Sequence, residues 1–317
     1  MKVVFMGSPE FALPSLKLLF EAEEIVLDLV VTQPPRPAGR GGKLNPTPVN
    51  KKADELGLDV MAVNDVNKAE HVQKISSCNP DYISVTAFGQ ILSRDILSLP
   101  ERAPVNLHAS LLPKYRGASP IQQAIINGDK KTGVTTILMD EGLDTGKLLM
   151  QREVKIGKED TAGSLHDRLA QEGAELLLES LIRHNSGKIT PVPQDDNKSS
   201  YAPRLQKEDG KIDFSRAAGK LVDFIRGMNP WPGAYTFYQG ERLKIWVAEK
   251  SHIEKPTDIE VKPGKILKAD PGEGLFVAAG RGLINLTELQ PAGRSTLSCQ
   301  EFINGYKPKP GEVLGGN

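Results

Sequence analysis

Cysteine is scarce in this chain. Its 317 residues include only two, Cys78 and Cys299, which lie far apart in the sequence. A disulfide framework or a structural zinc site needs several ligand residues at close, regular spacing, and this pair provides none. The sequence therefore predicts a protein of a reducing compartment that uses no metal.

Long hydrophobic runs are also missing. No segment approaches the roughly 20 apolar residues that span a bilayer. The apolar run after Lys2 is broken at Ser8, Pro9 and Glu10 after about five residues, fewer than the roughly 7 to 15 of an export signal. We therefore interpret this run as a strand and expect a soluble, cytoplasmic protein. Since no exposed apolar heptad is evident, we also expect a monomer.

Neither sign of charge dominates. The chain has 40 Lys+Arg and 40 Asp+Glu, and 39% of its residues are hydrophobic, as is ordinary for a globular protein of one or two domains. From residue 205 onward there are 16 basic and 14 acidic side chains, so this part is not a strongly basic RNA-binding domain. Any RNA contact there must be a local stripe. The candidates, which also fit an ordinary solvated face, are Lys207, Lys211, Arg216, Lys220 and Arg226.

The first part of the chain alternates short apolar runs with helical patterns. This alternation predicts a Rossmann-like, mostly parallel sheet with helices on both faces. The predicted strands are 3–6, 25–32, 82–86, 105–108, 134–139 and 148–154, and the predicted helices are 11–21, 49–56, 67–76, 120–127 and 162–184. The fold class is therefore α/β.

The character of the sequence changes after the last of these helices. Residues from about 185 to 205 are rich in Pro, Asp, Asn and Ser without periodicity, which is typical of a linker. A helix near 217–227 and short strands between turn residues follow, a pattern that favours a small OB-like β-barrel. We expect a catalytic domain over 1–188, a linker over 189–205 and a second domain over 206–317.

The segment Gly7-Ser8-Pro9-Glu10 follows the first strand, where a dinucleotide-binding fold places its phosphate loop. The G-x-G-x-x-G pattern is absent, and Pro9 and Glu10 are poor neighbours for a pyrophosphate. We interpret the segment as a tight turn and expect no bound NAD.

Asn106 and His108 stand two residues apart at the end of a short apolar strand. Side chains on a strand alternate with period two, so both point to the same side. Asp144 follows another strand in a glycine-flanked turn, and active sites of open α/β sheets lie beyond the carboxyl ends of their strands. An amide, an imidazole and a carboxylate there can polarise a carbonyl and move a proton, so we predict a catalytic trio.

Four segments resemble the methionyl-tRNA formyltransferases, members of the folate-dependent formyltransferases. They are residues 6–12 (MGSPEFA), 106–121 (NLHASLLPKYRGASPI), 140–146 (DEGLDTG) and 229–234 (NPWPGA). The resemblance covers essentially the whole chain. It implies transfer of a formyl group from 10-formyltetrahydrofolate to the amino group of methionine carried by initiator tRNA.

The resemblance also implies roles for individual residues. Asn106, His108 and Asp144 match the family's catalytic trio. The tetrahydrofolate-binding segment matches Ser110, Leu111, Leu112 and Pro113. Asn106 and a protonated His108 are suitable donors to the oxyanion that forms when the amine attacks the formyl carbon. Either Asp144 or His108 could make the first proton transfer.

Other positions keep two interpretations. Ile91, Leu111 and Leu112 could line a slot for the flat pterin or simply pack in a core. The pair Arg116-Gly117 could contact the folate tail or turn the chain. Asp140 and Glu141 could shape the loop or be solvated.

Residues 33–46 form a long segment rich in proline, glycine and positive charge between a strand and a helix. A loop of this length inside a compact domain is more often functional than idle. The resemblance implies that it enters the tRNA acceptor stem, that Arg40 matches the arginine reading the end of the stem, and that Lys43 is nearby. In the second domain, Lys207 and Lys211 are the predicted tRNA contacts.

Competing functions fit less well. Glycinamide ribonucleotide formyltransferases usually have one domain and a glycine-rich loop after the first strand, and the hydrolase and dehydrogenase relatives typically lack an amide at the position of Asn106. A noncatalytic RNA-binding protein would have no use for the trio. The intact trio and the second domain therefore favour the enzyme that acts on initiator tRNA.

Overall fold

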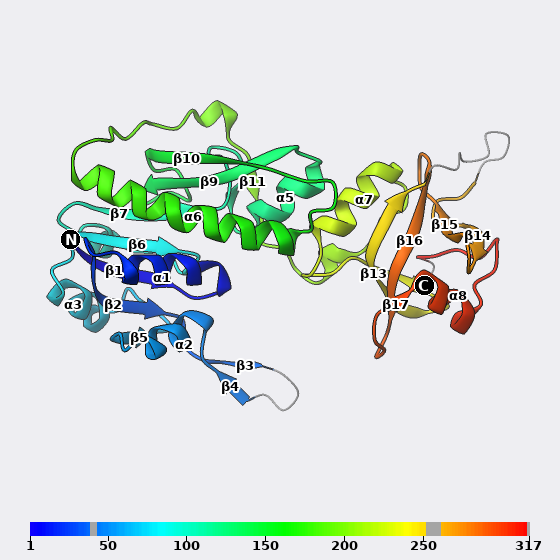
Figure 1. The fold of residues 1–317 in the computed structure, drawn as a ribbon, viewed down its shortest axis with the longest axis horizontal. Coiled ribbons are helices and arrows are strands. Elements are labelled where there is room, and N and C mark those ends of the chain that lie inside the picture. The colour runs from blue at the N-terminus through cyan, green and yellow to red at the C-terminus, as the bar shows by residue number, and fades with distance from the viewer. Residues whose placement is uncertain (39–42, 252–260, 316–317) are drawn as a thin grey trace. The chain divides into compact units, whose positions relative to one another are not determined.

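The computed structural model describes residues 1–38, 43–251 and 261–315 (Figure 1). Its contacts divide the chain into two compact units. Unit 1 contains residues 1–120, 131–155 and 166–202, and unit 2 contains 121–130, 156–165 and 203–317. This division describes packing, whereas catalysis by 1–188 and tRNA binding by 206–317 stay predictions.

Unit 1 is built on a seven-stranded sheet in the order β10-β9-β7-β6-β1-β2-β5. Strands β5, β2, β1, β6 and β7 are parallel, and β9 and β10 continue the sheet in antiparallel pairing. The bounds are β1 (Lys2–Gly7), β2 (Val26–Thr32), β5 (Val60–Ala62), β6 (Tyr82–Thr86), β7 (Ala103–His108), β9 (Lys131–Leu138) and β10 (Leu148–Lys155). The predicted mostly parallel sheet is confirmed.

Helices cover both faces of this sheet, and Figure 1 shows α1 and α6 in front of it. On one face, Val4 and Val85 share a core with Ile75 of α3 and Ile96 of α4. On the other face, Gly173 of α6 lies against Leu107 of β7. The bounds are α1 (Leu13–Glu21), α2 (Pro48–Glu55), α3 (Ala69–Ser77), α4 (Arg94–Leu97) and α6 (Ala162–Asn185), with a 3-10 turn η1 (Glu10–Ala12), whereas α5 (Pro120–Asn127) lies almost wholly in unit 2. Strands buried on both faces explain the near-continuous apolar runs.

Two short pairings lie where the sequence predicts only loop and linker. In the segment 33–46, β3 (Arg36–Ala38) and β4 (Lys43–Asn45) form an antiparallel hairpin. In the segment 189–205, β11 (Tyr201–Ala202) pairs in parallel with β8 (Arg116–Gly117), and a 3-10 turn η2 spans Asp196–Lys198. These strands have two or three residues, too few for a period-two pattern.

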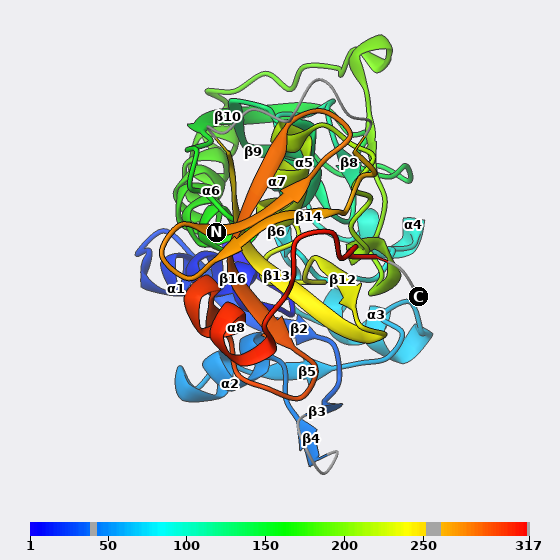
Figure 2. The same ribbon diagram turned by 90° about the vertical axis from the view of Figure 1, so that its right-hand side faces the viewer.

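Unit 2 contains an antiparallel sheet in the order β12-β13-β16-β15-β14, with β17 added on β16 (Figures 1 and 2). The strands are β12 (Tyr235–Tyr238), β13 (Glu241–Lys250), β14 (Ile266–Asp270), β15 (Gly274–Ala278), β16 (Leu283–Pro291) and β17 (Leu297–Ser298). The helical elements are η3 (Glu208–Gly210), α7 (Ala218–Gly227) and α8 (Cys299–Tyr306). Leu221 and Ile225 of α7 and Phe302 of α8 lie in the core against Ile245 and Leu286 of the sheet. The predicted second domain of short antiparallel strands is confirmed.

The turn after β1 is a structural junction. The hydroxyl of Ser8 donates to the carbonyl of Phe88 at 3.1 Å and accepts from the backbone N–H of Gln33 at 3.2 Å. It therefore ties the carboxyl ends of β1, β2 and β6 together. Within the described residues, no helix is both long and apolar enough to cross a bilayer.

Candidate active site

The carboxyl end of β7 presents Asn106 and His108 on one face of the sheet. Asn106 lies beside Val85 in the parallel pairing with β6, so it shares the face covered by α3 and α4. His108 is 6% exposed, and its Nε2 lies 2.9 Å from the carbonyl oxygen of Tyr115. The strand therefore fixes both side chains, and the loop after it fixes the ring.

Asp144 joins these two residues from the loop after β9. Its Oδ1 lies 3.4 Å from Nδ2 of Asn106, and its Oδ2 lies 3.5 Å from Nδ1 of His108. The backbone N–H of Gly117 donates to Oδ2 at 2.8 Å, the shortest of these contacts. The structure thus brings the predicted trio together, although the residues are 38 positions apart in the chain.

The neighbours of His108 restrict its protonation. A carbonyl oxygen can only accept a hydrogen bond, so Nε2 carries a proton. Nδ1 faces the carboxylate of Asp144 at 3.5 Å. The ring therefore lies between an acceptor at each nitrogen, the carbonyl oxygen of Tyr115 and the carboxylate of Asp144.

The loop that carries Asp144 is tightly shaped. Asp144 has a backbone φ of +55°, a conformation that few side chains adopt, and a Cβ on Gly146 would lie 1.7 Å from the carbonyl oxygen of Leu138. Asp140 accepts from the N–H of Gly142 at 3.1 Å and from the hydroxyl of Thr145 at 2.7 Å. Asp140 therefore shapes the loop, one of its two predicted interpretations.

Residues 110–113, the predicted folate segment, fold against β9. The hydroxyl of Ser110 donates to the carbonyl of Lys114 at 2.6 Å, and Thr135 of β9 bridges the carbonyl of Ser110 and the N–H of Leu112. Ser110 and Leu112 are buried, whereas Leu111 and Pro113 are partly exposed. Leu111 also packs on Gly133, where a Cβ would meet it at 2.6 Å. Only Leu111 and Pro113 of this segment can offer side-chain surface to a ligand.

Two loops beside the trio expose apolar side chains. Ile91, which follows β6, is 82% exposed, and Leu143, next to Asp144, is 55% exposed. The two loops are linked because Arg94 Nε lies 3.7 Å from Glu141 Oε1.

Sequence reasoning missed the residues of the segment 192–202, which packs against both loops of the trio. Gln194 contacts the Asp144 loop and Arg116, whose guanidinium also lies 2.7 Å from Asp196. These contacts of the Arg116 side chain favour the interpretation of Arg116 as a residue that turns the chain. A polar run without periodicity gives no sequence signal for such a role.

The structure describes only some of the predicted tRNA contacts. Arg40 lies outside the described residues, and Lys43 belongs to β4, with only its backbone described. In unit 2, Lys207 is exposed, and Lys211 is exposed with its ammonium 5.7 Å from the ring centroid of Phe237.

Arg226, a further stripe candidate, has a structural role. Its guanidinium pairs with Asp223 at 2.8 Å and donates to the carbonyls of Gly157 and Asp160, and its side chain is only 11% exposed. Because its nitrogens already bind Asp223 and two carbonyls, this mostly covered guanidinium is a poor candidate for an RNA contact.

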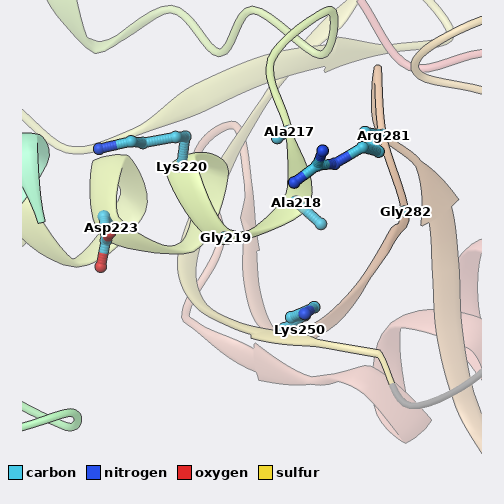
Figure 3. Close-up of a pocket in the computed structure, with 8 residues that line it drawn as sticks. All are labelled: Ala217, Ala218, Gly219, Lys220, Asp223, Lys250, Arg281 and Gly282. Carbon is cyan, nitrogen blue, oxygen red and sulfur yellow. The ribbon is translucent and has the colours of Figure 1, made fainter.

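A basic hollow of about 430 Å³ lies in unit 2 (Figure 3). It lies between the first turn of α7, the end of β13 and the turn before β16, and Figure 3 shows Lys250 and Arg281 at its sides. Lys220 instead donates to the carbonyl of Asn127 at 2.7 Å. Hereafter, Lys250 and Arg281 are called the hollow pair.

A part-buried polar contact lies at the start of β6, at the opposite end of this strand from the trio. Burial raises the pKa of Tyr82 to about 12 and lowers the pKa of His184, and the Tyr82 hydroxyl lies 2.9 Å from His184 Nδ1. Across 1–38, 43–251 and 261–315, no group of three or more His, Cys, Asp and Glu side chains is placed to hold a metal ion.

The chain belongs to the formyl transferase family. The model of its main domain, described as "Formyl transferase", matches residues 1–181, and "Formyl transferase, C-terminal domain" matches residues 204–307. The trio lies in the first match, and the antiparallel sheet of unit 2 lies in the second.

Relatives with nearly full-length similarity are named methionyl-tRNA formyltransferase. The protein of Halothermothrix orenii is 45% identical over 316 residues, which cover 99% of this chain and 100% of the relative. That of Citrifermentans bemidjiense is 46% identical over 315 residues, covering 99% of this chain and 96% of the relative.

Solved structures share the fold. A methionyl-tRNA formyltransferase from Clostridium thermocellum has a TM-score of 0.55 at 19% identity, covering 83% of this chain and 100% of that one. An N-formyltransferase from Helicobacter canadensis, solved with folinic acid and dTDP-3-aminofucose, has a TM-score of 0.66 at 18% identity, covering 92% and 99%.

Proposed function

We propose that this protein transfers the formyl group of 10-formyltetrahydrofolate to the free amino group of methionyl initiator tRNA, producing N-formylmethionyl-tRNA for translation initiation. The observation that carries the proposal is the convergence of Asn106, His108 and Asp144 beyond the carboxyl end of β7. It lies in a chain that aligns over 99% of its length with relatives named for this activity. This function implies work in the cytoplasm, where initiator tRNA is used, and we expect a monomer.

Asn106 and His108 supply hydrogen-bond donors for the reacting carbonyl. As the amine nitrogen bonds to the formyl carbon, negative charge develops on the formyl oxygen. Asn106 Nδ2 is only weakly engaged at 3.4 Å from Asp144, so it can turn toward that oxygen. In the proposed reaction a protonated His108 is the second donor to that oxygen.

Asp144 organises the proton movements. The attacking ammonium must lose a proton before or during attack, and N10 of the folate must gain one as the carbon–N10 bond breaks. The Asp144 carboxylate accepts a proton from the amine, directly or through water, and it faces His108 Nδ1 at 3.5 Å. The pair can then return a proton to N10, which also receives the electron pair of the breaking carbon–N10 bond. An ammonium that becomes a formamide loses two protons, so the second one passes to solvent and the step balances without another reactant.

The donor fits the surface next to the trio. Tetrahydrofolate has a flat, mostly apolar ring system with polar edges, and Ile91 and Leu143 supply exposed apolar surface on two linked loops. We assign Ser110, Leu111, Leu112 and Pro113 to the same binding site. In this assignment Leu111 and Pro113 contact the ligand, while the inward-facing Ser110 and Leu112 hold the segment on β9.

The tRNA contacts are assigned to three places. Arg40 and Lys43 belong to the β3–β4 segment, in which a guanidinium at position 40 could read a base edge or pair with phosphate. Lys207 and Lys211 are exposed cations near the start of the second domain. The hollow pair offers two more positive charges to the tRNA backbone.

The test is a transfer assay with 10-formyltetrahydrofolate carrying a labelled formyl group. We expect formyl-methionine on initiator tRNA charged with methionine, and little label on charged elongator tRNA. Absence of formyl-methionine above background would contradict the proposal. Release of labelled formate with no formyl-methionine would identify a hydrolase instead.

A further inference from the structure

The segment Val192–Ala202, here called the strap, runs along both loops that support the trio. At its start, Val192 and Leu148 exchange two backbone hydrogen bonds of 2.8 and 2.9 Å, just after the Asp144 loop. At its end, the carbonyl of Ala202 accepts from Ala118 at 2.9 Å and from Ser119 at 3.3 Å. The strap is therefore attached at one end to the Asp144 loop and at the other end to the loop that follows His108.

Gln194 belongs to the strap, and both ends of its side-chain amide bind residues outside the strap. Its Nε2 donates to the carbonyl oxygens of Asp144 at 2.7 Å and of Gly146 at 2.8 Å. Its Oε1 accepts from Arg116 Nη2 at 2.8 Å and from Nε at 3.2 Å. Each amide hydrogen and the acceptor oxygen thus have partners, which fixes the side chain in one orientation.

The two bonds from Gln194 hold the backbone at Asp144, a residue with an unfavourable conformation. Asp144 has a φ of +55°, which costs free energy unless its surroundings hold it. Both carbonyls that Gln194 binds flank this turn. The Asp144 carboxylate in turn faces His108 at 3.5 Å, so a small rotation of the turn changes that distance.

Ser200 supports the other side of the imidazole. Its hydroxyl accepts from the N–H of Tyr115 at 2.9 Å, and the carbonyl of Tyr115 lies 2.9 Å from His108 Nε2. The strap therefore holds the partner of Nε2 through Ser200 and the partner of Nδ1 through Gln194.

We propose that Gln194 is a positioning residue for formyl transfer, which sets the Asp144 carboxylate against His108 through its two bonds to the Asp144 loop. This inference rests on the proposed function. Gln194 touches neither substrate nor the reacting atoms, and it acts through Asp144.

The first experiment compares Gln194→Met with the full-length wild-type chain. Methionine has similar length and cannot donate to the two carbonyls. We expect kcat to fall roughly 10- to 100-fold, since a displacement of about 1 Å in a catalytic group has this effect. KM for the folate donor and for tRNA should change less than about twofold. Asp196→Asn is the matched control, because Asp196 is 80% exposed and contacts Arg116 but not the Asp144 loop.

Gln194→Glu separates the two halves of the amide. A glutamate retains acceptors for Arg116 but loses both donors, so it should behave like Gln194→Met. If Gln194→Glu keeps wild-type kcat, the contact with Arg116 is sufficient and the proposal is wrong.

A double-mutant cycle tests whether Gln194 acts through Asp144. In single turnovers, Gln194→Met should slow an Asp144→Asn enzyme by less than about twofold, because the group it positions is already altered. An equal slowing in both backgrounds would overturn the proposal. The pH profile of kcat should also change in Gln194→Met and stay unchanged in Asp196→Asn.

A direct measurement keeps this inference separate from the proposed function. The ¹⁵N chemical shifts of the His108 imidazole in the folded chain report its hydrogen bonds without any substrate. We expect them to move in Gln194→Met and not in Asp196→Asn. Unchanged shifts would refute the positioning role, whereas an inactive wild-type protein with moved shifts would refute only the proposed function.

Discussion

Asn106 is the residue whose loss should affect catalysis most simply. Its amide is partly exposed and only loosely bound to Asp144, so Asn106→Ala removes an oxyanion donor without emptying a core. Such a donor typically contributes about 2.7 to 4 kcal/mol to the barrier, or roughly 10²- to 10³-fold in kcat. Steady-state kinetics should show this loss with an unchanged melting temperature. A fall of less than tenfold would remove Asn106 from the catalytic assignment.

Gly146 should be equally sensitive, for a steric reason. A methyl group at this position would lie 1.7 Å from the carbonyl oxygen of Leu138, so the loop of Asp144 must shift. We expect Gly146→Ala to lower kcat by about 10-fold or more. Gly305→Ala on α8 is the matched control, because a Cβ at Gly305 meets nothing within 4 Å. Wild-type kcat in Gly146→Ala would show that the loop tolerates displacement.

At the scale of elements, a change in the segment between β3 and β4 should affect the use of tRNA but not the binding of folate. Arg40→Ala should raise KM for tRNA or lower kcat with tRNA, with little change in folate affinity, because it removes a fork that pairs with phosphate or a base edge. Formylation kinetics and direct folate titration measure the two effects. Lys52→Ala on α2, where Lys52 pairs with Glu55 at 2.8 Å, is the charge-matched control. Equal losses of folate and tRNA function would refute this assignment.

The contact between β6 and α6 should make stability depend on pH. Burial lowers the pKa of His184, so the unfolded chain binds a proton more readily than the folded one. This contribution to the free energy of unfolding is present above about pH 6.5, the ordinary value, and decreases as the pH falls. The drop in melting temperature between about pH 7.5 and about pH 5 should therefore be smaller in His184→Gln than in wild type. An identical drop in both would show that His184 does not contribute.

Elements differ in how far the sequence could predict them. The long apolar strands and Pro120–Asn127 were predictable because each carries its own pattern. Val60–Ala62 forms β5 with three residues, so its pairing with β2 decides the structure rather than its pattern. Ser110 and Leu112 match a ligand-binding segment, but their inward orientation depends on Thr135, which is distant in sequence.

The geometry of the trio, too, could be predicted from the sequence only in part. Period two alone places Asn106 and His108 on one side, and the structure agrees. The approach of Asp144 depends on β9 pairing beside β7, and its contact with Gly117 depends on the turn at positions 115–117. The support from Gln194 could not be predicted, because an isolated glutamine in a polar segment gives no pattern.

At the scale of the whole molecule, the chain must hold a polyanion with no net charge of its own. Binding should therefore depend on a few local cations and on salt. The double variant Lys250→Ala/Arg281→Ala should weaken tRNA binding. The slope of log affinity against log salt concentration should also become less steep by up to about 2, roughly one for each phosphate contact that is lost. Lys17→Ala on α1 is the control. An unchanged slope would exclude the hollow pair from the tRNA contact.

The strap also bears on how such enzymes can be recombined. The family model of the first domain ends at residue 181, and a composition-based boundary would fall near 188. The hydrogen bonds of the strap to the loops at positions 113–119 and 144–148 continue to Ala202. A chimera that exchanges second domains between relatives should therefore join the two sequences after Ala202, since an earlier junction would pair one parent's trio with the other parent's support.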